Sequence, residues 1–589
     1  MYLGTAATPA LLDDADASHA LVSVEMLQRH DWAVMYMNGI RYLMKAPLHY
    51  WAVALSYMAF GQTAFATRLP VALAMVLLTL MCFEFGQRFF SPRAGLYAGL
   101  AVATSVGMFI FTRIMIPEAI YALQFTAIFY LFLRAWTGSL DKRLGYWGVA
   151  ALCGLAVLTR GLVGIVFPLG GIVGFIIVTR SWKRWRELHL VSGSLIFLAI
   201  AAPWHIICEM RAPGFFWSYF INEHVNRALG TRYPPDYDAV PLLLWWGLHL
   251  VWFFPWSVFL PYALKQLPHP RSWGKAMSTE AQARLMLFVW AAVIIGFFSI
   301  EPGSRMEYYS FGAWPAVAIL LGLGLASAEE NVRSWLPRLQ GGLAAIGLAI
   351  AGVLSALVWR AAQVKATGDI SQFLTYNKQD YRLSMGHALD LTPQAFADLR
   401  GPAIGAAICF GLAFTVAWLL RRQKRNLAAT MTVAIGMVGF VFCANSAYGI
   451  FEPQMSSHVL AVAMEKYLRP QDPIVFYGEF GAGSSISFYT HRQVVMLNGR
   501  YNNLEFGSYF PDAPRIFLTD PEFPPLWNSP DRVFYFVQPD VRRAALARLP
   551  ANSSWLLARS GGKEIYVNHP LAPDEKTLAQ LRAENKELY

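Results

Sequence analysis

Three carboxylates stand close together near the start of the chain, in LLDDADASHALVSVEML at residues 11–27. Asp13, Asp14 and Asp16 fall within four positions. A carboxylate can take the proton of an attacking hydroxyl group, so this cluster is a candidate general base. The residues that follow have helical apolar spacing, and Asp16 could act as the N-terminal cap of that helix. One cap does not need three acids, which favours a catalytic role for the cluster.

A basic and aromatic stretch follows at residues 38–51, NGIRYLMKAPLHYW. Arg41, Lys45 and His49 are spaced four apart and would share one face of a helix, beside Tyr42. Such a stripe could bind a phosphate group through its cations. It could equally be an interfacial belt that anchors the chain at the depth of the lipid headgroups. The spacing alone leaves both interpretations open.

A third pair of charged residues stands in TRIMIPEAI, where Arg113 and Glu118 lie at the expected top of a membrane span. A carboxylate at this position is costly unless it is paired or hydrated, so Glu118 is a functional candidate. Acids and cations gathered on one side of a membrane suit the transfer of a group from a lipid phosphate to a hydroxyl or amine. One carboxylate would take the proton, and cations would stabilise the leaving phosphate.

Membrane-spanning helices must position these residues. The 589-residue chain is 56% hydrophobic and only 14% charged, well below the roughly 25% of a soluble domain. Apolar runs of about 20 residues predict a polytopic α-helical membrane protein with about twelve visible spans. These lie near residues 70–86, 94–112, 118–135, 147–159, 162–178, 189–207, 241–262, 284–300, 310–327, 339–358, 403–420 and 427–447.

Lys and Arg are concentrated in alternate loops, near residues 88–93, 142–143, 180–186, 265–275, 333–338 and 421–425. This positive-inside pattern explains the net charge of +11 without nucleic-acid binding and places these loops in the cytoplasm. The other loops and both ends of the chain then face the periplasm. An even number of spans also predicts that a first helix, upstream of residue 1, is missing.

The residues after 448 change character, with short β-type runs bounded by Gly, Pro, Asn and Asp. They predict a small periplasmic α/β domain. The expected organisation is therefore a first periplasmic loop at 1–69, a transmembrane helical domain at 70–447 and the α/β domain at 448–589.

The first loop resembles that of integral-membrane glycosyltransferases that use polyprenyl-phosphate sugars. These are relatives of dolichyl-phosphate-mannose–protein mannosyltransferase and of the transferase that adds aminoarabinose to lipid A. The resemblance covers roughly residues 1–320. The matching motifs are Glu25-Met26-Leu27, Asp31-Trp32, Asn38-Gly39, Lys45-Ala46-Pro47-Leu48, Tyr50-Trp51, Phe60-Gly61 and Arg68-Leu69-Pro70, with LTRGLVGIVFPL, APWHI, NEHVNRALG and FFPWSVFLP further along.

The resemblance implies a C-type glycosyltransferase fold, inversion at the sugar carbon, and a general base at Asp14 or Asp16. The family's Asp-Glu pair falls on Ala15-Asp16, and a shift of one residue puts Asp14 in its first slot, so the choice stays open. Lys45 matches a lysine that binds the lipid phosphate, and Glu118 matches a second-loop acid. Further donor-binding candidates from this resemblance are His224, Arg227, Arg305 and Tyr309.

We therefore predict a bacterial inner-membrane enzyme that transfers a sugar from undecaprenyl phosphate to a lipid, glycan or protein acceptor. No cofactor is expected, although a divalent ion at the acidic loop is an alternative. A transporter or flippase of lipid-linked sugars is a rival, and it predicts acids at mid-membrane depth and internal repeats. A second rival is an inactive, lipid-binding relative.

Overall fold

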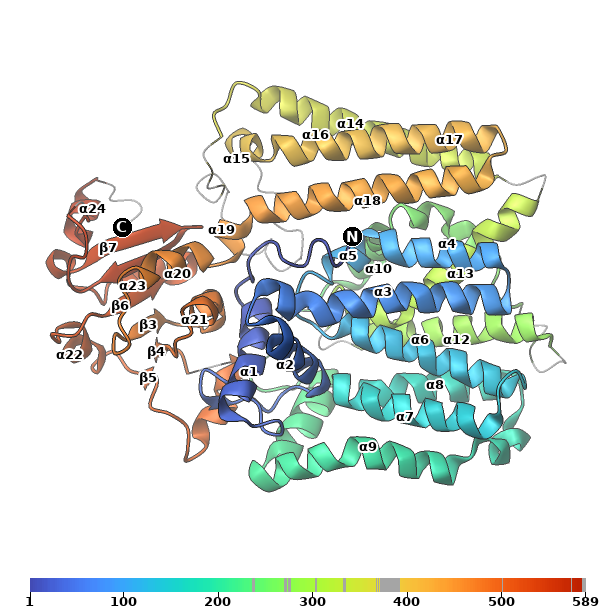
Figure 1. Cartoon of the computed structure of the whole chain (residues 1–589), viewed down its shortest axis with the longest axis horizontal. Coiled ribbons are helices and arrows are strands. Elements are labelled where there is room, and N and C mark those ends of the chain that lie inside the picture. Colours follow the sequence, from blue (N-terminus) through green and yellow to red (C-terminus); the bar gives the residue numbers. More distant parts are fainter. Residues whose placement is uncertain are drawn as a thin grey trace.

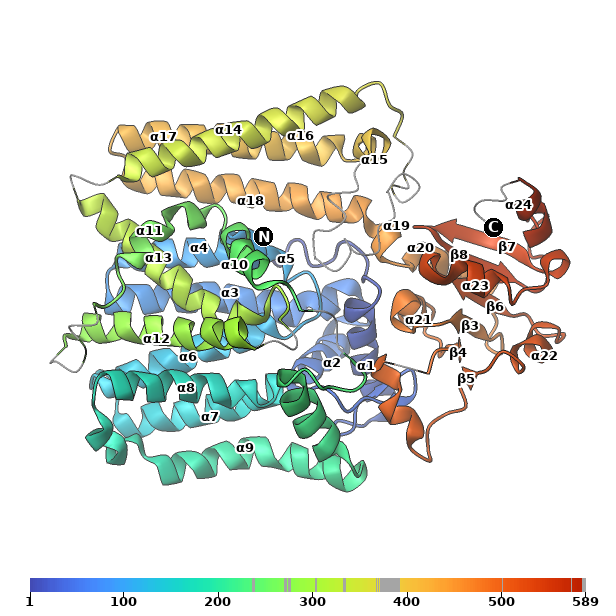
Figure 2. The same cartoon turned by 180° about the vertical axis from the view of Figure 1, so that it is seen from behind.

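The computed structural model describes residues 1–235, 239–269, 273, 277–301, 305–331, 335–366, 368, 370, 392–500, 502–573 and 575–584. Long, roughly parallel helices form a bundle (Figure 1 and Figure 2). The first 60 residues and a C-terminal domain lie together at one end of this bundle, although they are the two extremes of the sequence.

Among the described residues, eight helical segments are long and apolar enough to cross a membrane. A bent pair, α10 (Leu242–Trp252) and the helical turns at Trp256–Leu264, adds a ninth if it is one crossing. The eight are α3 (Ala64–Phe89), α6 (Glu118–Trp136), α9 (Leu190–Arg211), α12 (Thr279–Ile300), α13 with the preceding turn (Tyr309–Glu330), α14 (Leu336–Ala361), α16 to α17 (Arg400–Arg422) and α18 (Asn426–Ile450).

Three further helices complete the bundle: α4 (Pro92–Thr104), α7 (Lys142–Arg160) and α8 (Val163–Val178). With the bent pair that begins at α10 (Leu242–Trp252), they correspond to the remaining four of the twelve expected apolar segments. The helical membrane architecture is thus confirmed, and α3 begins ahead of the expected boundary at residue 70.

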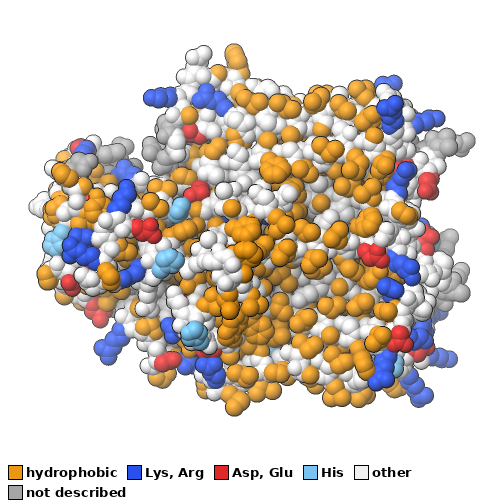
Figure 3. All heavy atoms as spheres, in the orientation of Figure 1, with side chains coloured by type: hydrophobic (Ala, Val, Ile, Leu, Met, Phe, Trp, Pro, Cys, Tyr) orange, Lys and Arg blue, Asp and Glu red, His pale blue; other side chains and the backbone are white. Residues whose placement is uncertain are grey.

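The two ends of the bundle differ in chemistry. Figure 3 shows a broad hydrophobic surface over the bundle and charged side chains, with Lys and Arg prominent, at the edge far from the C-terminal domain. Two of the basic loops, the α3–α4 and α17–α18 connections, lie at that far edge (Figure 1). Residues 270–272, 274–276 and 332–334 of two basic loops lie outside the described residues.

The first loop contains α1 (Ala15–Arg29), a short antiparallel pair β1 (Tyr36–Met37) and β2 (Ile40–Arg41), and α2 (Leu48–Phe60). Asn38 and Gly39 connect the two strands with φ of 53° and 79°, as a tight hairpin turn requires. The expectation that Arg41, Lys45 and His49 share a helical face is therefore wrong, because the hairpin ends at Arg41 and the helix begins only after Pro47.

The C-terminal α/β domain is confirmed, and it follows α18 through α19 (Glu452–Met455). Its six-stranded sheet has the order β5-β4-β3-β6-β8-β7, parallel from β5 to β6 and antiparallel beyond. The strands are β3 (Ile474–Tyr477), β4 (Val495–Leu497), β5 (Phe517–Leu518), β6 (Phe534–Val537), β7 (Trp555–Ser560) and β8 (Lys563–Val567), with helices α20 (His458–Glu465), α21 (Ser484–Thr490), α22 (Phe523–Trp527), α23 (Arg542–Leu546) and α24 (Leu578–Glu584) around them.

One hydrophobic core joins this domain to the first loop. It contains Leu21 and Val22 of α1 together with Ile474, Phe476 and Ile486 of the domain, all buried. The two segments therefore fold against each other rather than as independent units.

Candidate active site

A cavity of about 590 Å³ lies where the first loop meets the helical bundle. Its polar lining includes Asp14, His19, Tyr42, Lys45, His49, Glu118, Arg160, Glu223, His224, Arg227, Arg232 and Tyr309. Its apolar lining includes residues of α8, of α12 and of the segment after the π-helical turn Trp217–Asn226. Val166, Leu229 and Phe297 in this apolar part are 52, 66 and 38% exposed, so the cavity is open there rather than sealed.

Asp14 is the acid of the first cluster that lines the cavity. It precedes α1 and has the backbone angles φ 61° and ψ −116°, a conformation that a non-glycine residue adopts only when its surroundings enforce it. Asp14 is exposed to the open cavity, but desolvation by the surrounding protein, together with the charges of Glu479 and Asp13, raises its pKa to about 6. The carboxylate is thus a base that takes up a proton close to neutral pH.

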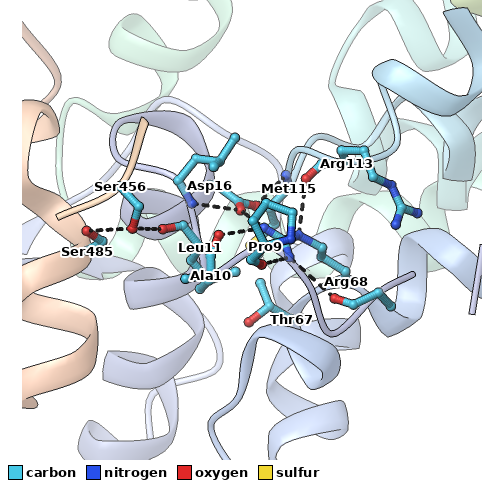
Figure 4. Close-up of polar contacts among 12 residues, drawn as sticks. Pro9, Ala10, Leu11, Asp16, Thr67, Arg68, Arg113, Met115, Ser456 and Ser485 are labelled. Atoms are coloured by element: carbon cyan, nitrogen blue, oxygen red, sulfur yellow. Dashed lines mark hydrogen bonds and ion pairs between the residues drawn. The ribbon is translucent and has the colours of Figure 1, made fainter. Parts of the chain in front are cut away.

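Asp16 does not line the cavity and instead joins a buried network of polar contacts (Figure 4). Its Oδ2 accepts hydrogen bonds from Arg68 Nη2 at 2.7 Å and Leu12 N at 3.1 Å, and its Oδ1 accepts from Met115 N at 3.0 Å. The same Arg68 also donates to Pro9 O at 2.6 Å and to Arg113 O at 3.1 Å. Both side chains of the Asp16–Arg68 pair are essentially inaccessible, which makes the pair a structural tie between the first loop and α3.

Lys45, which follows the hairpin, also lines the cavity. It forms no ion pair with any residue that the structure describes. Burial, together with the nearby positive charge of Arg227, lowers the pKa of Lys45 to about 8. The ammonium remains a cation at neutral pH, and it is available to an anionic ligand.

Two histidines lie beside Lys45. His19 Nδ1 is 2.8 Å from Tyr50 Oη, while both ring nitrogens of the buried His49 lack a hydrogen-bond partner among the described residues. Burial lowers the pKa of His19 to about 3 and of His49 to about 4. Both imidazoles are neutral at physiological pH, so Lys45 is the charged member of this group of three side chains.

Glu118 begins α6 and is fully buried. Arg160, the last residue of α7, donates to Glu118 Oε1, while Glu118 Oε2 has no partner among the described residues. The guanidinium of Arg160 also lies over the rings of Tyr121 and Tyr309, at 5.2 and 5.4 Å from their centroids. Glu118 is therefore paired at the cavity wall, which lowers the cost of burying its charge.

His224 fixes the break between α7 and α8. Its Nδ1 contacts Tyr219 O at 2.6 Å, and its Nε2 accepts from Leu162 N at 3.2 Å. Gly161 has φ 71°, and a Cβ there would overlap the imidazole of His224. His224 thus holds the turn that presents Arg160 to the cavity.

Arg227, one helical turn beyond Glu223, connects two sides of the cavity. Its Nη2 donates to Glu223 Oε2 at 2.7 Å and its Nη1 to Tyr309 Oη at 3.2 Å. Glu223 also accepts from Arg232 Nε at 2.7 Å. Although burial alone would raise the pKa of Glu223, Arg227, Arg232 and Lys45 keep it below its usual value.

Besides Asp16, three predicted site residues do not line the cavity. Arg41 pairs with Asp512 at 2.8 Å at the surface. Arg113 donates to Thr5 O at 2.9 Å, and Arg305 donates to Val240 O at 3.0 Å. The other predicted residues Asp14, Tyr42, Lys45, His49, Glu118, His224, Arg227 and Tyr309 are brought together.

Sequence reasoning missed Arg160, Glu223 and Arg232. Arg160 interrupts the apolar run between residues 147 and 178, and a cation at such a position is itself a signal of function. Glu223 lies within NEHVNRALG and Arg232 two residues beyond it, and in that motif only His224 and Arg227 are predicted donor-binding residues.

No group of three or more His, Cys, Asp or Glu residues in the described part of the chain is arranged to hold a metal ion. Metal independence stays a prediction.

The model of the dolichyl-phosphate-mannose-protein mannosyltransferase family matches residues 44–207. The predicted resemblance to polyprenyl-phosphate-sugar glycosyltransferases and the predicted C-type fold are confirmed, and the chain is an integral membrane glycosyltransferase.

Its relatives carry more particular names. Undecaprenyl phosphate-alpha-4-amino-4-deoxy-L-arabinose arabinosyl transferase from Aeromonas salmonicida is 25% identical over 543 residues, 86% of this chain and 85% of the relative. A numbered form of that enzyme from Pseudomonas fluorescens is 29% identical, over only 53% of this chain and 55% of the relative. The crystal structure of ArnT from Cupriavidus metallidurans bound to undecaprenyl phosphate has a TM-score of 0.80, at 24% identity over 97% of this chain and 96% of that one.

Proposed function

We propose that this protein transfers a sugar from undecaprenyl phosphate to lipid A on the periplasmic side of the bacterial inner membrane. The observation that carries the proposal is a single cavity that combines an unpaired cation, a carboxylate titrating near neutral pH and an open apolar part. The names of the relatives from Aeromonas and Pseudomonas support the donor.

In this reaction Lys45 binds the phosphate of the donor. As the bond between the sugar carbon and the phosphate oxygen breaks, negative charge grows on the leaving phosphate, and a cation aimed at that charge lowers the barrier. The apolar residues Val166, Leu229 and Phe297 offer the surface on which the polyprenyl chain can pack.

Asp14 acts as the base in the proposed step. An acceptor hydroxyl attacks the sugar carbon from the face opposite the phosphate and transfers its proton to the Asp14 carboxylate, so the configuration inverts. A pKa near 6 leaves most Asp14 ionised at neutral pH while keeping it basic enough to take the proton. A phosphate oxygen of lipid A is already ionised at neutral pH and needs no base, so the pH dependence of transfer tells the two acceptor groups apart.

The distribution of charge supports this orientation. Basic loops lie at the end of the bundle far from the C-terminal domain, and basic loops tend to face the cytoplasm. This assignment puts Asp14, Lys45 and the C-terminal domain in or next to the periplasm. The cavity acids then lie at the outward end of the bundle, whereas a transporter or flippase would need them at mid-membrane depth.

The test is transfer of radiolabelled aminoarabinose from undecaprenyl phosphate to lipid A by the full chain in vesicles. Asp14→Asn and Lys45→Met are each expected to lower the rate by about 100-fold or more. Arg41→Met removes a cation of the same loop that does not line the cavity and should retain full activity. Equal activity of all three variants and the wild type would refute the proposed site.

A further inference from the structure

The C-terminal domain and the end of α19 contact the acidic segment at Leu11, Asp13 and Asp14. Ser456 Oγ donates to Leu11 O at 2.7 Å, and Asp13 N donates to Met455 O at 2.8 Å. One residue further, Asp14 N donates to Gly481 O at 2.7 Å. The backbone on the N-terminal side of α1 is therefore fixed by residues more than 400 positions away in the sequence.

The carboxylate of Asp13 is enclosed by donors from the domain. Its Oδ1 accepts from Ser485 N at 2.8 Å, and its Oδ2 accepts from Ser457 Oγ and from Lys563 Nζ, both at 2.6 Å. The side chains of Asp13 and Lys563 are only 8 and 9% exposed. Removing either partner of a buried pair leaves the other charge uncompensated, which makes this contact stronger than a surface ion pair.

Asp14 needs such support because of its backbone. The angles φ 61° and ψ −116° are unfavourable for a residue with a Cβ, and they persist only when the surroundings enforce them. The Gly481 turn lies directly against it, since a Cβ on Gly481 would come within 3.0 Å of Asp14 Oδ1. The domain thus enforces the conformation that directs Asp14 into the cavity.

We propose that Lys563 is a positioning residue, which holds Asp13 and thereby fixes the Asp14 carboxylate in the cavity. The C-terminal domain then completes the active site instead of serving only as an appended module. This inference rests on the proposed role of Asp14 as the base. A displacement of about 1 Å at a reacting group can lower a rate by about 100-fold, so loss of this pair should act on turnover.

The variants are Lys563→Met, which keeps the length of the side chain, Lys563→Arg, which keeps the charge, and Asp13→Asn. Lys576→Met is the matched control, because Lys576 lies in the same domain but pairs with Glu584 at the surface. We expect Lys563→Met to lower kcat by 10- to 100-fold with little change in the KM for the donor. Lys563→Arg should restore most of the activity, and Lys576→Met should behave as wild type.

A second readout follows Asp14 without turnover. Dicyclohexylcarbodiimide reacts with protonated carboxyl groups in apolar surroundings, and the labelled peptide is quantified by mass spectrometry as a function of pH. The charged groups that act on Asp14 are Asp13 and Glu479, and Lys45 lines the same cavity. Lys563→Met should move the labelling midpoint to higher pH because the charge of Asp13 is no longer balanced, whereas Asp13→Asn should move it to lower pH.

The two readouts separate the inference from the proposed function. Unchanged kcat and an unchanged labelling midpoint in Lys563→Met would overturn the positioning role, as would equal losses in Lys563→Met and Lys563→Arg. If Asp14→Asn retains full transfer, the proposed base is wrong, and the positioning role fails with it even where the labelling midpoint shifts. If Lys563→Met does not fold, Lys563→Arg and Asp13→Asn decide by the same criteria.

Discussion

Replacing Asp16 with asparagine tests the different roles of two aspartates that stand two positions apart. Asp14 lines the cavity, whereas Asp16 pairs with Arg68 in the protein interior. We expect Asp14→Asn to remove activity and leave stability nearly unchanged. Asp16→Asn should have the opposite effect in the purified protein. It should lower the stability, while the molecules that remain folded still catalyse transfer.

The magnitude follows from the contacts of Asp16. Its two carboxylate oxygens accept hydrogen bonds from Arg68 Nη2, Leu12 N and Met115 N, and an amide would turn one acceptor into a donor that faces another donor. Breaking a buried ion pair by removing one partner costs about 3–5 kcal/mol. The entropy of unfolding is about 2.1 cal/mol/K per residue. If all 589 residues unfold together, the lost free energy lowers the melting temperature by about 2–4 °C, and by more if a smaller unit unfolds.

The assay is thermal unfolding of the purified protein in detergent, together with transfer activity per folded molecule. Asp520→Asn is the control, because Asp520 pairs with Arg548 at an exposed site, where ion pairs contribute about 0–1 kcal/mol. A melting temperature of Asp16→Asn equal to that of Asp520→Asn would contradict the structural role. So would a 100-fold loss of activity in folded Asp16→Asn, because that result would make Asp16 the base.

Three further predictions concern the cavity. Lys45→Met should raise the KM for the polyprenyl donor and lower kcat by about 100-fold, because the other cations among the described cavity residues are paired with acids. Initial rates at varied donor concentration measure both constants. Transfer to a hydroxyl acceptor should rise with pH through about 6, because Asp14 must be ionised to accept a proton, and should fall above about 8, where Lys45 loses its charge. A profile without the rise near 6 indicates a phosphate acceptor. Gly161→Ala should lower both the melting temperature and the activity, because the new methyl group meets His224 and forces an alanine into a positive φ; wild-type values for both would show that the α7–α8 turn can adjust.

The sequence predicted the bundle well because the physics of spanning a bilayer is local. Each of the twelve expected apolar segments coincides with a helix or a broken pair of helices. In the C-terminal domain the short β-type runs DPIVFYGEF, QVVMLNG, RIFLTD, RVFYFV and EIYVNH predicted β3, β4, β5, β6 and β8. Strand β7 (Trp555–Ser560) was missed because LLA breaks the alternation of a half-buried strand.

The site was only partly predictable, because charges that are close in sequence can point to different places. Asp14 and Asp16 are separated by one residue, and only the three-dimensional contacts with Arg68 and Gly481 distinguish them. Arg41 resembled a phosphate ligand as strongly as Lys45 did, but the hairpin turns it toward Asp512. The partners that decide these orientations lie far away in the sequence, where spacing carries no information.

The pairing of Asp13 with Lys563 also sets an order of events during synthesis. The two residues are 550 positions apart, so the acidic segment is made long before the residues that hold it. At about 5–20 residues per second, the ribosome needs roughly half a minute to two minutes to cover that interval. Through this time the acidic segment lacks Gly481 and Lys563, and on the proposed role of the Asp13–Lys563 pair the nascent protein becomes competent only once the C-terminal domain has been made and has docked.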